Sequence, residues 1–168
     1  MSSIRNPEKV TILATGGTID KFYSVAGTLD IGAPAAQNLL DRVITDIKFE
    51  IRPLIGKDSL VMTDADRAEL ATALNAVRGG QVIITHGTDT MSETARYLAE
   101  HADVRQKTVV LTGAMQPAVR ARSDAGFNLG AALSAVNLLP PGVYISMSGR
   151  IFPAASVRKD RARGIFEG

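Results

Sequence analysis

The sequence predicts an α/β fold, a three-layer sandwich on a mostly parallel sheet of the Rossmann or flavodoxin type. Five short runs rich in β-branched residues are apolar throughout, which is typical of strands covered by helices on both faces. Segments with helical spacing separate these runs, and such alternation favours a parallel sheet. With 168 residues, 45% of them apolar, the chain is expected to form one well-packed domain over residues 1–168.

The expected helices follow from their start signals and the expected strands from the apolar runs. Thr63 followed by Asp66, and Thr90 followed by Glu93, have the spacing of a capping box, in which side chains bond to free backbone N–H groups at a helix start. These pairs predict the starts of two helices. Strands are expected over residues 10–14, 49–54, 81–85, 108–111 and 143–147, and two further helices over about 35–45 and 123–137.

Composition excludes several classes of function. The net charge is only +2 and aromatic residues make up 5% of the chain without any Trp, so a basic, stacking surface for nucleic acid is not expected. No apolar run is long enough for a membrane helix and the polar start is unlike a signal peptide, so we expect a cytoplasmic protein that binds no membrane. The lack of Cys excludes thiolate chemistry, and two His residues give no metal-ligand cluster.

Small and hydroxyl residues follow four consecutive predicted strands. In a parallel α/β sheet, ligands bind outside the carboxyl ends of the strands, so these residues are expected to form a site. Thr18 follows two glycines that allow a sharp turn, and it could be a helix cap, a phosphate contact or a nucleophile. The four groups are Thr15-Gly16-Gly17-Thr18, Asp58-Ser59, His86-Gly87-Thr88-Asp89-Thr90 and Gly113-Ala114-Met115-Gln116-Pro117.

Several strings occur in the order and approximate spacing of one known family. They are "TGGTI" at residues 15–19, "THGTDTM" at 85–91, "TGAMQP" at 112–117 and "SDAGFNL" at 123–129, followed by a lysine at Lys159. Through these motifs the chain resembles the bacterial-type L-asparaginase family over nearly its whole length. The resemblance implies an α/β amidohydrolase that cleaves the side-chain amide of L-asparagine, releases ammonia, and uses no metal and no organic cofactor.

The resemblance also implies roles for individual residues. Thr18 would be the nucleophile that forms an acyl-enzyme, and Thr88, Asp89 and Lys159 would form a hydrogen-bonded set that assists it. A lysine beside a threonine can stabilise the deprotonated hydroxyl or accept its proton. Ser59 would hold the substrate α-carboxylate and Asp89 the α-ammonium group. The backbone N–H groups of Thr88 and Ala114 would line the oxyanion site. The expected substrate-binding residues are Gly17, Asp58, Ser59, Gly87 and Ala114.

Three features depart from the family pattern. The chain ends at Gly168, soon after the lysine, so it resembles a short form that lacks the C-terminal domain of longer members. Leu60 stands where the family usually has a glutamine. Leu29 stands where the longer members carry a mobile-loop tyrosine, so Tyr23 is the expected catalytic tyrosine. Because family members are generally homo-oligomers, a dimer or tetramer is also expected.

The loop over residues 20–32 is expected to close over substrate, with Gly27 and Gly32 as hinges. Local sequence alone gives other interpretations of the site residues: Thr88 and Asp89 as loop and capping residues, Tyr23 as an exposed loop tyrosine, and Lys159 as part of a solvated charged run. Among their neighbours, His86 is expected to be a packed strand-end residue, and Asp124 and Asn128 are expected to cap and satisfy the last helix.

The leading function is hydrolysis of free L-asparagine, with glutamine a poorer substrate because its extra methylene must fit the same pocket. Two alternatives remain open. One is a non-catalytic amino-acid-binding domain that kept the pocket. The other is an amidase for glutamine or another asparagine-like amide, including an amide within a larger substrate.

Overall fold

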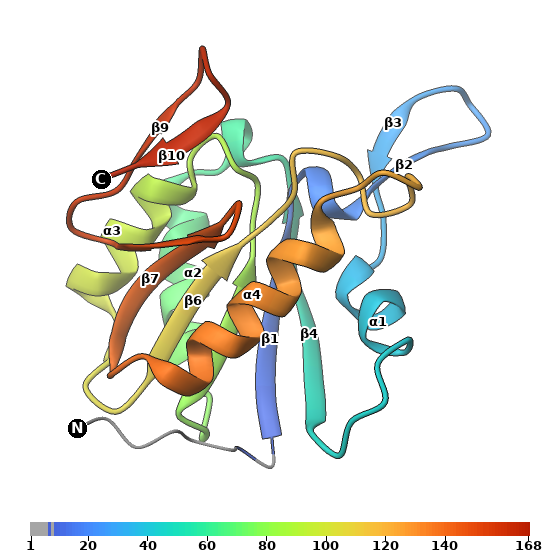
Figure 1. Ribbon diagram of the computed structural model, residues 1–168. Helices are drawn as coiled ribbons and strands as arrows, with labels where there is room; N and C mark the ends of the chain where they lie inside the picture. Colours follow the sequence, from blue (N-terminus) through green and yellow to red (C-terminus); the bar gives the residue numbers. More distant parts are fainter. Residues whose placement is uncertain (1–6, 8) are drawn as a thin grey trace.

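The computed structural model describes residue 7 and residues 9–168; residues 1–6 and 8, which hold most of the polar start, lie outside the described part. A six-stranded sheet organises the chain (Figure 1). In chain order its strands are β1 Lys9–Gly16, β4 Lys48–Lys57, β5 Gln81–Thr85, β6 Thr108–Thr112, β7 Gly142–Met147 and β8 Arg150–Pro153. All five predicted strands are present.

The strands lie in the order β4-β1-β5-β6-β7-β8. The five from β4 to β7 pair in parallel, and β8 runs antiparallel to β7 at one edge. Numbered by their order along the chain, the parallel strands are arranged 2-1-3-4-5, which is the flavodoxin-like order. The predicted sheet type is therefore confirmed.

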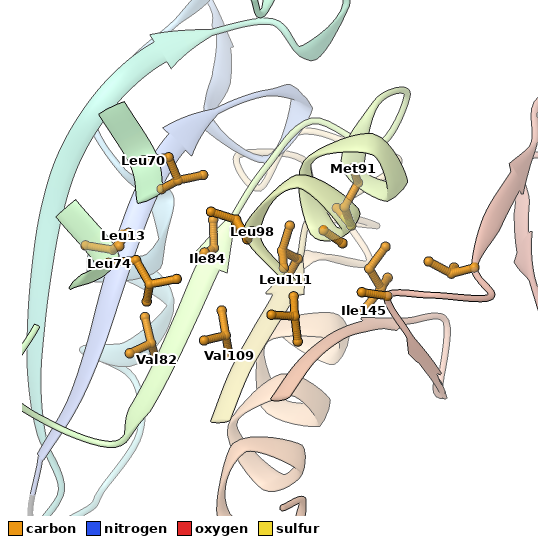
Figure 2. Close-up of a cluster of buried hydrophobic side chains, with 14 of the residues drawn as sticks. Leu13, Leu70, Leu74, Val82, Ile84, Met91, Leu98, Val109, Leu111 and Ile145 are labelled. Atoms are coloured by element: carbon orange, nitrogen blue, oxygen red, sulfur yellow. The ribbon is translucent and has the colours of Figure 1, made fainter. Parts of the chain in front are cut away.

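Helices cover both faces of the sheet, as a three-layer sandwich requires. Helices α1 (Ala35–Leu40) and α4 (Ala125–Leu138) lie on one face, and α2 (Asp64–Asn75) and α3 (Met91–His101) lie on the other (Figure 1). Side chains from one strand alternate between the two cores: Val82 and Ile84 pack toward α2 and α3, whereas Ile83 packs toward α1 and α4. Figure 2 shows the first of these cores. Burial on both faces explains why the strands are apolar throughout.

One predicted capping box is confirmed and the other is wrong. Before α2, the Thr63 hydroxyl accepts a hydrogen bond from the Asp66 N–H at 3.3 Å, and the Asp66 carboxylate accepts one from the Thr63 N–H at 2.8 Å. Before α3, Thr90 makes no side-chain cap; its hydroxyl donates instead to the Ser59 carbonyl at 2.8 Å. Helix α1 also ends at Leu40, earlier than expected, and α4 begins at Ala125.

Short elements that the sequence pattern did not predict complete the fold. They are the 3₁₀ turns η1 Thr18–Asp20 and η2 Ser59–Val61, the hairpin of β2 Lys21–Tyr23 and β3 Leu29–Ile31, the strand β8, and the hairpin of β9 Arg158–Asp160 and β10 Ile165–Glu167. Strands of three or four residues are too short to show a period, so the sequence pattern does not predict them. Both hairpins stand above the edge where the parallel strands end (Figure 1). Among the described helices, none combines the length and apolar character needed to cross a membrane.

Candidate active site

The point where the sheet reverses its winding lies between β1 and β5. The chain leaves β1 toward β4 on one side and leaves β5 toward β6 on the other. In such sheets the loops diverge there and leave a crevice, in which ligands bind. Thr18 follows β1 and Thr88 follows β5, so both predicted hydroxyl groups lie at this reversal point.

Three backbone segments meet in contact at this edge, and glycines make the contact possible. A β-carbon on Gly17 would lie 2.4 Å from Gly87 Cα, and one on Gly87 would lie 2.6 Å from Ser59 Cβ. Gly17 also has φ 83°, a conformation that favours glycine. The structure thus brings Gly17, Gly87 and Ser59 together, and Thr18 lies next to the segment that carries Thr88.

Lys159 joins the two polar residues of the β5 loop. Its Nζ donates to Thr88 Oγ1 at 2.8 Å and to Asp89 Oδ1 at 2.7 Å. The Lys159 side chain is only 7% exposed, whereas that of Asp89 is 34% exposed. The predicted set of Thr88, Asp89 and Lys159 is therefore hydrogen-bonded, although the residues are about seventy positions apart in the chain.

The β9–β10 hairpin explains why Lys159 points inward from a charged run. Lys159 lies opposite Phe166 across the hairpin, so their side chains share one face. Phe166 is buried and its ring centroid lies 6.5 Å from that of Phe152, so this shared face points inward. Arg158, the neighbour of Lys159, is exposed and pairs with Glu167 at 2.9 Å. The interpretation of Lys159 as a solvated surface residue is therefore wrong.

Ser59 and its neighbour Asp58 differ in their contacts. Ser59 is 1% exposed, and its hydroxyl has no hydrogen-bond partner within the described part of the chain. Asp58 is already engaged: it accepts from Lys21 Nζ at 2.6 Å and from the Leu60 N–H at 3.0 Å. Partial burial alone would raise the pKa of Asp58, but these two bonds more than offset it and hold the pKa below its usual value.

Thr18 and Tyr23 are not joined by a hydrogen bond. Thr18 is half-buried at the start of η1. Tyr23 is 64% exposed on β2, and the Arg120 guanidinium lies 5.9 Å from its ring centroid. Beside it is an apolar pocket of about 460 Å³ between the β2–β3 hairpin and the segment after β6. The pocket is lined by Phe22, Tyr23, Leu29, Pro117, Val119 and Arg120.

The segment predicted to be a mobile loop is the β2–β3 hairpin. Gly27, with φ 77°, lies in the turn at its tip, where bending would move little of the hairpin, and its role as a hinge stays a prediction. Gly32 lies at the base, where its N–H donates to the Asp20 carbonyl at 2.8 Å. Asp20 is itself buried, and its Oδ1 accepts from the Ala35 N–H at 2.7 Å. Burial raises the pKa of Asp20 to about 6, which the sequence pattern did not indicate.

The loop after β6 is held by two residues that were expected to cap α4. Asp124 makes no side-chain cap; its carboxylate accepts from the N–H groups of Met115 and Gln116, each at about 3 Å. Asn128 is fully buried and donates from Nδ2 to the Gly113 carbonyl at 2.9 Å. The capping prediction is therefore wrong, because both polar groups face the preceding loop. The sequence signal for these loop contacts is the spacing of Asp124 and Asn128, which are four residues apart and directly follow a strand-end loop.

His86 is fully buried, as expected for a packed strand-end residue. Burial lowers its pKa to about 4, and its Nδ1 lies 2.7 Å from the Gly87 carbonyl. No three His, Cys, Asp or Glu side chains within residue 7 and residues 9–168 form a group that could hold a metal ion.

The family model "Asparaginase, N-terminal" matches residues 9–165, which is most of the chain. The chain belongs to the asparaginase family. The solved structure of the thermostable L-asparaginase from Thermococcus kodakarensis superposes on this asparaginase-family chain with a TM-score of 0.87 and 30% identity, covering 95% of this chain and 51% of that one.

Curated relatives of this asparaginase-family chain carry more than one name. The probable periplasmic L-asparaginase of Haemophilus influenzae is 36% identical over 162 residues, covering 89% of this chain and 46% of the relative. A glutamyl-tRNA(Gln) amidotransferase component from Methanococcus vannielii is 30% identical over 164 residues, covering 87% of this chain and 35% of the relative. The chain thus spans about half the length, or less, of the curated relatives it matches.

Proposed function

We propose that this chain hydrolyses the side-chain amide of L-asparagine to L-aspartate and ammonia through a threonine nucleophile. The contact that carries the proposal is the pair of bonds from Lys159 to Thr88 and Asp89, at 2.8 and 2.7 Å, beside the point between β1 and β5 where the sheet reverses its winding. A buried amine bonded to a hydroxyl gives a route for proton transfer, which nucleophilic catalysis by threonine needs.

The reaction proceeds in two steps. The Thr18 hydroxyl oxygen attacks the amide carbon while its proton passes through the Thr88 hydroxyl to Lys159. For this transfer the Lys159 nitrogen acts as an unprotonated amine, which keeps one N–H bond to Asp89 and accepts the proton from the Thr88 hydroxyl through its lone pair. The C–N bond then breaks, the same route returns the proton to the leaving nitrogen as ammonia departs, and an ester remains on Thr18. In the second step water attacks this ester, its proton follows the same path, and Thr18 regains its hydrogen. The balance is one amide and one water consumed, and one carboxylate and one ammonium ion formed.

Two residues are suited to hold the amino-acid end of the substrate. The buried Ser59 hydroxyl, which has no partner in the described structure, can donate to an α-carboxylate. Asp89 bonds to Lys159 through Oδ1 and is 34% exposed, so its second oxygen can accept from an α-ammonium group. Leu60 is 61% exposed and adds no polar contact where the family usually has a glutamine.

Ammonia release from asparagine, glutamine and small amides tests the proposal. Thr18→Ala should abolish release from asparagine, and Lys159→Met should lower the rate by about 10²- to 10⁴-fold. Lys9→Met is a matched control, because Lys9 also forms an ion pair, with Glu50, near the opposite ends of β1 and β4. Wild-type activity in Lys159→Met would contradict the proposal. Mass spectrometry of enzyme quenched during turnover should find the acyl group on Thr18; an adduct on Thr88 instead would reassign the nucleophile.

A second candidate function is hydrolysis of an asparagine or glutamine amide within a larger substrate. The similarity to a chain named as part of an amidotransferase supports it. Asparagine blocked at its α-amino or α-carboxyl group distinguishes the two functions, because free asparagine should be preferred if Ser59 and Asp89 hold both charged groups. Asparagine binding without ammonia release from any amide would instead indicate a binding domain.

We also propose a cytoplasmic location and a homo-oligomer, which cell fractionation and analytical ultracentrifugation can test.

A further inference from the structure

His86 and Asn128 make the same kind of contact to two neighbouring loops. The His86 Nδ1 lies 2.7 Å from the Gly87 carbonyl oxygen, and Asn128 Nδ2 donates to the Gly113 carbonyl oxygen at 2.9 Å. Both side chains are fully buried. Because a carbonyl oxygen can only accept, Nδ1 is the ring nitrogen of His86 that carries the proton. Each side chain therefore holds the carbonyl of one peptide unit.

These two peptide units also carry the N–H groups of Thr88 and Ala114. In a planar trans peptide, the carbonyl of one residue and the N–H of the next point in opposite directions. A bond that holds the Gly87 carbonyl against His86 therefore turns the Thr88 N–H away from His86. Asn128 acts in the same way on the peptide that joins Gly113 to Ala114.

The N–H groups of Thr88 and Ala114 have no acceptor among the described residues. Both residues are buried, with 6% and 1% exposure. Backbone N–H groups without a partner are uncommon on buried residues, so these two, at one sheet edge, are suited to donate to a bound oxygen.

The two loops touch each other. A β-carbon on Gly113 would lie 2.3 Å from the His86 carbonyl oxygen, and the His86 N–H donates to the Thr112 carbonyl at 2.9 Å. The two carbonyl contacts thus belong to adjoining segments at the carboxyl ends of β5 and β6.

We infer that His86 and Asn128 are positioning residues, which aim the Thr88 and Ala114 N–H groups at the oxyanion formed when the substrate amide is attacked. This inference rests on the proposed function. Neither side chain would touch the substrate; each would act by holding one peptide unit in place. Preoriented donors of this kind are effective because they need no reorganisation as the negative charge develops.

The surroundings keep both side chains in the donating state. Burial lowers the pKa of His86 to about 4, so its ring stays neutral at neutral pH, and Nε2, the nitrogen without a proton, has no partner in the described structure. Asn128 accepts from the Ser148 N–H through Oδ1 at 3.0 Å, which fixes its amide group with Nδ2 toward Gly113. Asp124 accepts a second bond from Nδ2 at 2.9 Å.

Steady-state kinetics on the full chain test the inference. His86→Leu and Asn128→Leu should each lower kcat by about ten- to hundredfold, with a smaller change in KM, because the misaimed donors act mainly in the transition state. His86→Asn should retain more activity than His86→Leu, since an amide N–H can replace Nδ1–H. Thr108→Val is the control: it removes a partly buried bond, from Thr108 Oγ1 to the Leu139 carbonyl at 3.1 Å, at the other end of β6. It should lower the melting temperature and leave kcat unchanged.

Nitrogen-15 NMR of the same proteins gives a readout that does not depend on activity. The His86 ring should show protonated Nδ1 and unprotonated Nε2 from pH 5 to 8, and the Thr88 and Ala114 amide signals should shift in the Leu variants but not in Thr108→Val. An Nε2-protonated ring, unshifted amides, or unchanged kcat in both Leu variants would overturn the inference. If wild-type protein hydrolyses no amide, the proposed function fails, while the NMR result still decides whether these side chains orient the two peptides.

Discussion

Tyr23 and Leu29 lie directly opposite each other across the β2–β3 hairpin. Directly opposed residues of an antiparallel pair share one face, so the two side chains belong to the same surface of the hairpin. The resemblance predicts that Leu29 stands where longer family members carry their mobile-loop tyrosine, and both residues line the same apolar pocket. The hairpin can therefore present a phenol from either strand at nearly the same place.

This pairing predicts a rescue experiment. Tyr23→Phe should lower the acylation rate if the phenol takes part in the reaction, and adding Leu29→Tyr should restore part of the loss, because the new hydroxyl starts from the opposed position. Single-turnover kinetics measures the rate for each variant. Full activity in Tyr23→Phe would remove the tyrosine from the mechanism, and Leu29→Tyr alone controls for effects of added bulk.

Thr63 and Thr90, which both begin a predicted capping box, should respond differently to substitution by alanine. Thr63→Ala removes the cap of α2 and should reduce the free energy of unfolding by about 1 kcal/mol without changing catalysis. Thr90→Ala removes the hydroxyl bonded to the Ser59 carbonyl, so it should raise KM for asparagine by loosening Ser59. Urea unfolding and steady-state kinetics on both variants test this contrast; equal effects on KM would contradict it.

The ion pair between Lys21 and Asp58 should affect the site by fixing the position of the segment that carries Ser59. It joins the base of the hairpin to the segment before Ser59, with Nζ and Oδ2 2.6 Å apart and the Lys21 side chain 19% exposed. If this is its role, Lys21→Met and Asp58→Asn should raise KM by similar factors, and the double variant should add little, because each change breaks the same contact. A much larger effect of Asp58→Asn would support the predicted direct contact with substrate.

Asp20 should make the protein less stable as the pH rises. Its pKa is about 6 in the folded protein and 3.8 in the reference state, so its stabilising contribution is present below pH 3.8 and is lost as the pH rises to about 6. Asp20→Asn removes this titration. The unfolding free energy of the variant relative to wild type should therefore increase between pH 4 and pH 7, by about 3 kcal/mol at most. Urea unfolding across this range measures the difference, and a constant difference would contradict the assignment.

His86 should have the opposite pH dependence. Its pKa of about 4 lies below the reference value of 6.5, so its contribution is present above pH 6.5 and is lost as the pH falls toward 4. The stability of His86→Asn should consequently fall less steeply than that of wild type between pH 6.5 and pH 4. Parallel urea titrations of the two proteins test this, and identical pH profiles would show that the histidine charges freely in the folded state.

Strand-end residues could be predicted from the sequence because they follow strong local patterns. The apolar runs indicated β5 and β6, the rule for parallel sheets placed Thr88 at the carboxyl edge, and the motif strings pointed to Lys159. What these patterns could not show was the inward direction of Lys159, which depends on a three-residue strand pairing with Phe166. They also missed the contacts of Asp124 and Asn128, since a polar residue at a helix start looks like a cap until the neighbouring loop is placed.

The sequence by itself therefore determined the sheet, its two covered faces and the groups available for chemistry, because burial and periodicity act over a few residues. Tertiary structure decided which of those groups meet. Lys159 reaches Thr88 and Asp89 across about seventy residues, Thr90 holds Ser59 instead of capping α3, and His86 and Asn128 each hold a carbonyl in adjoining loops. These contacts form only when the sheet brings separate strand ends to one edge, and no local pattern encodes that closeness.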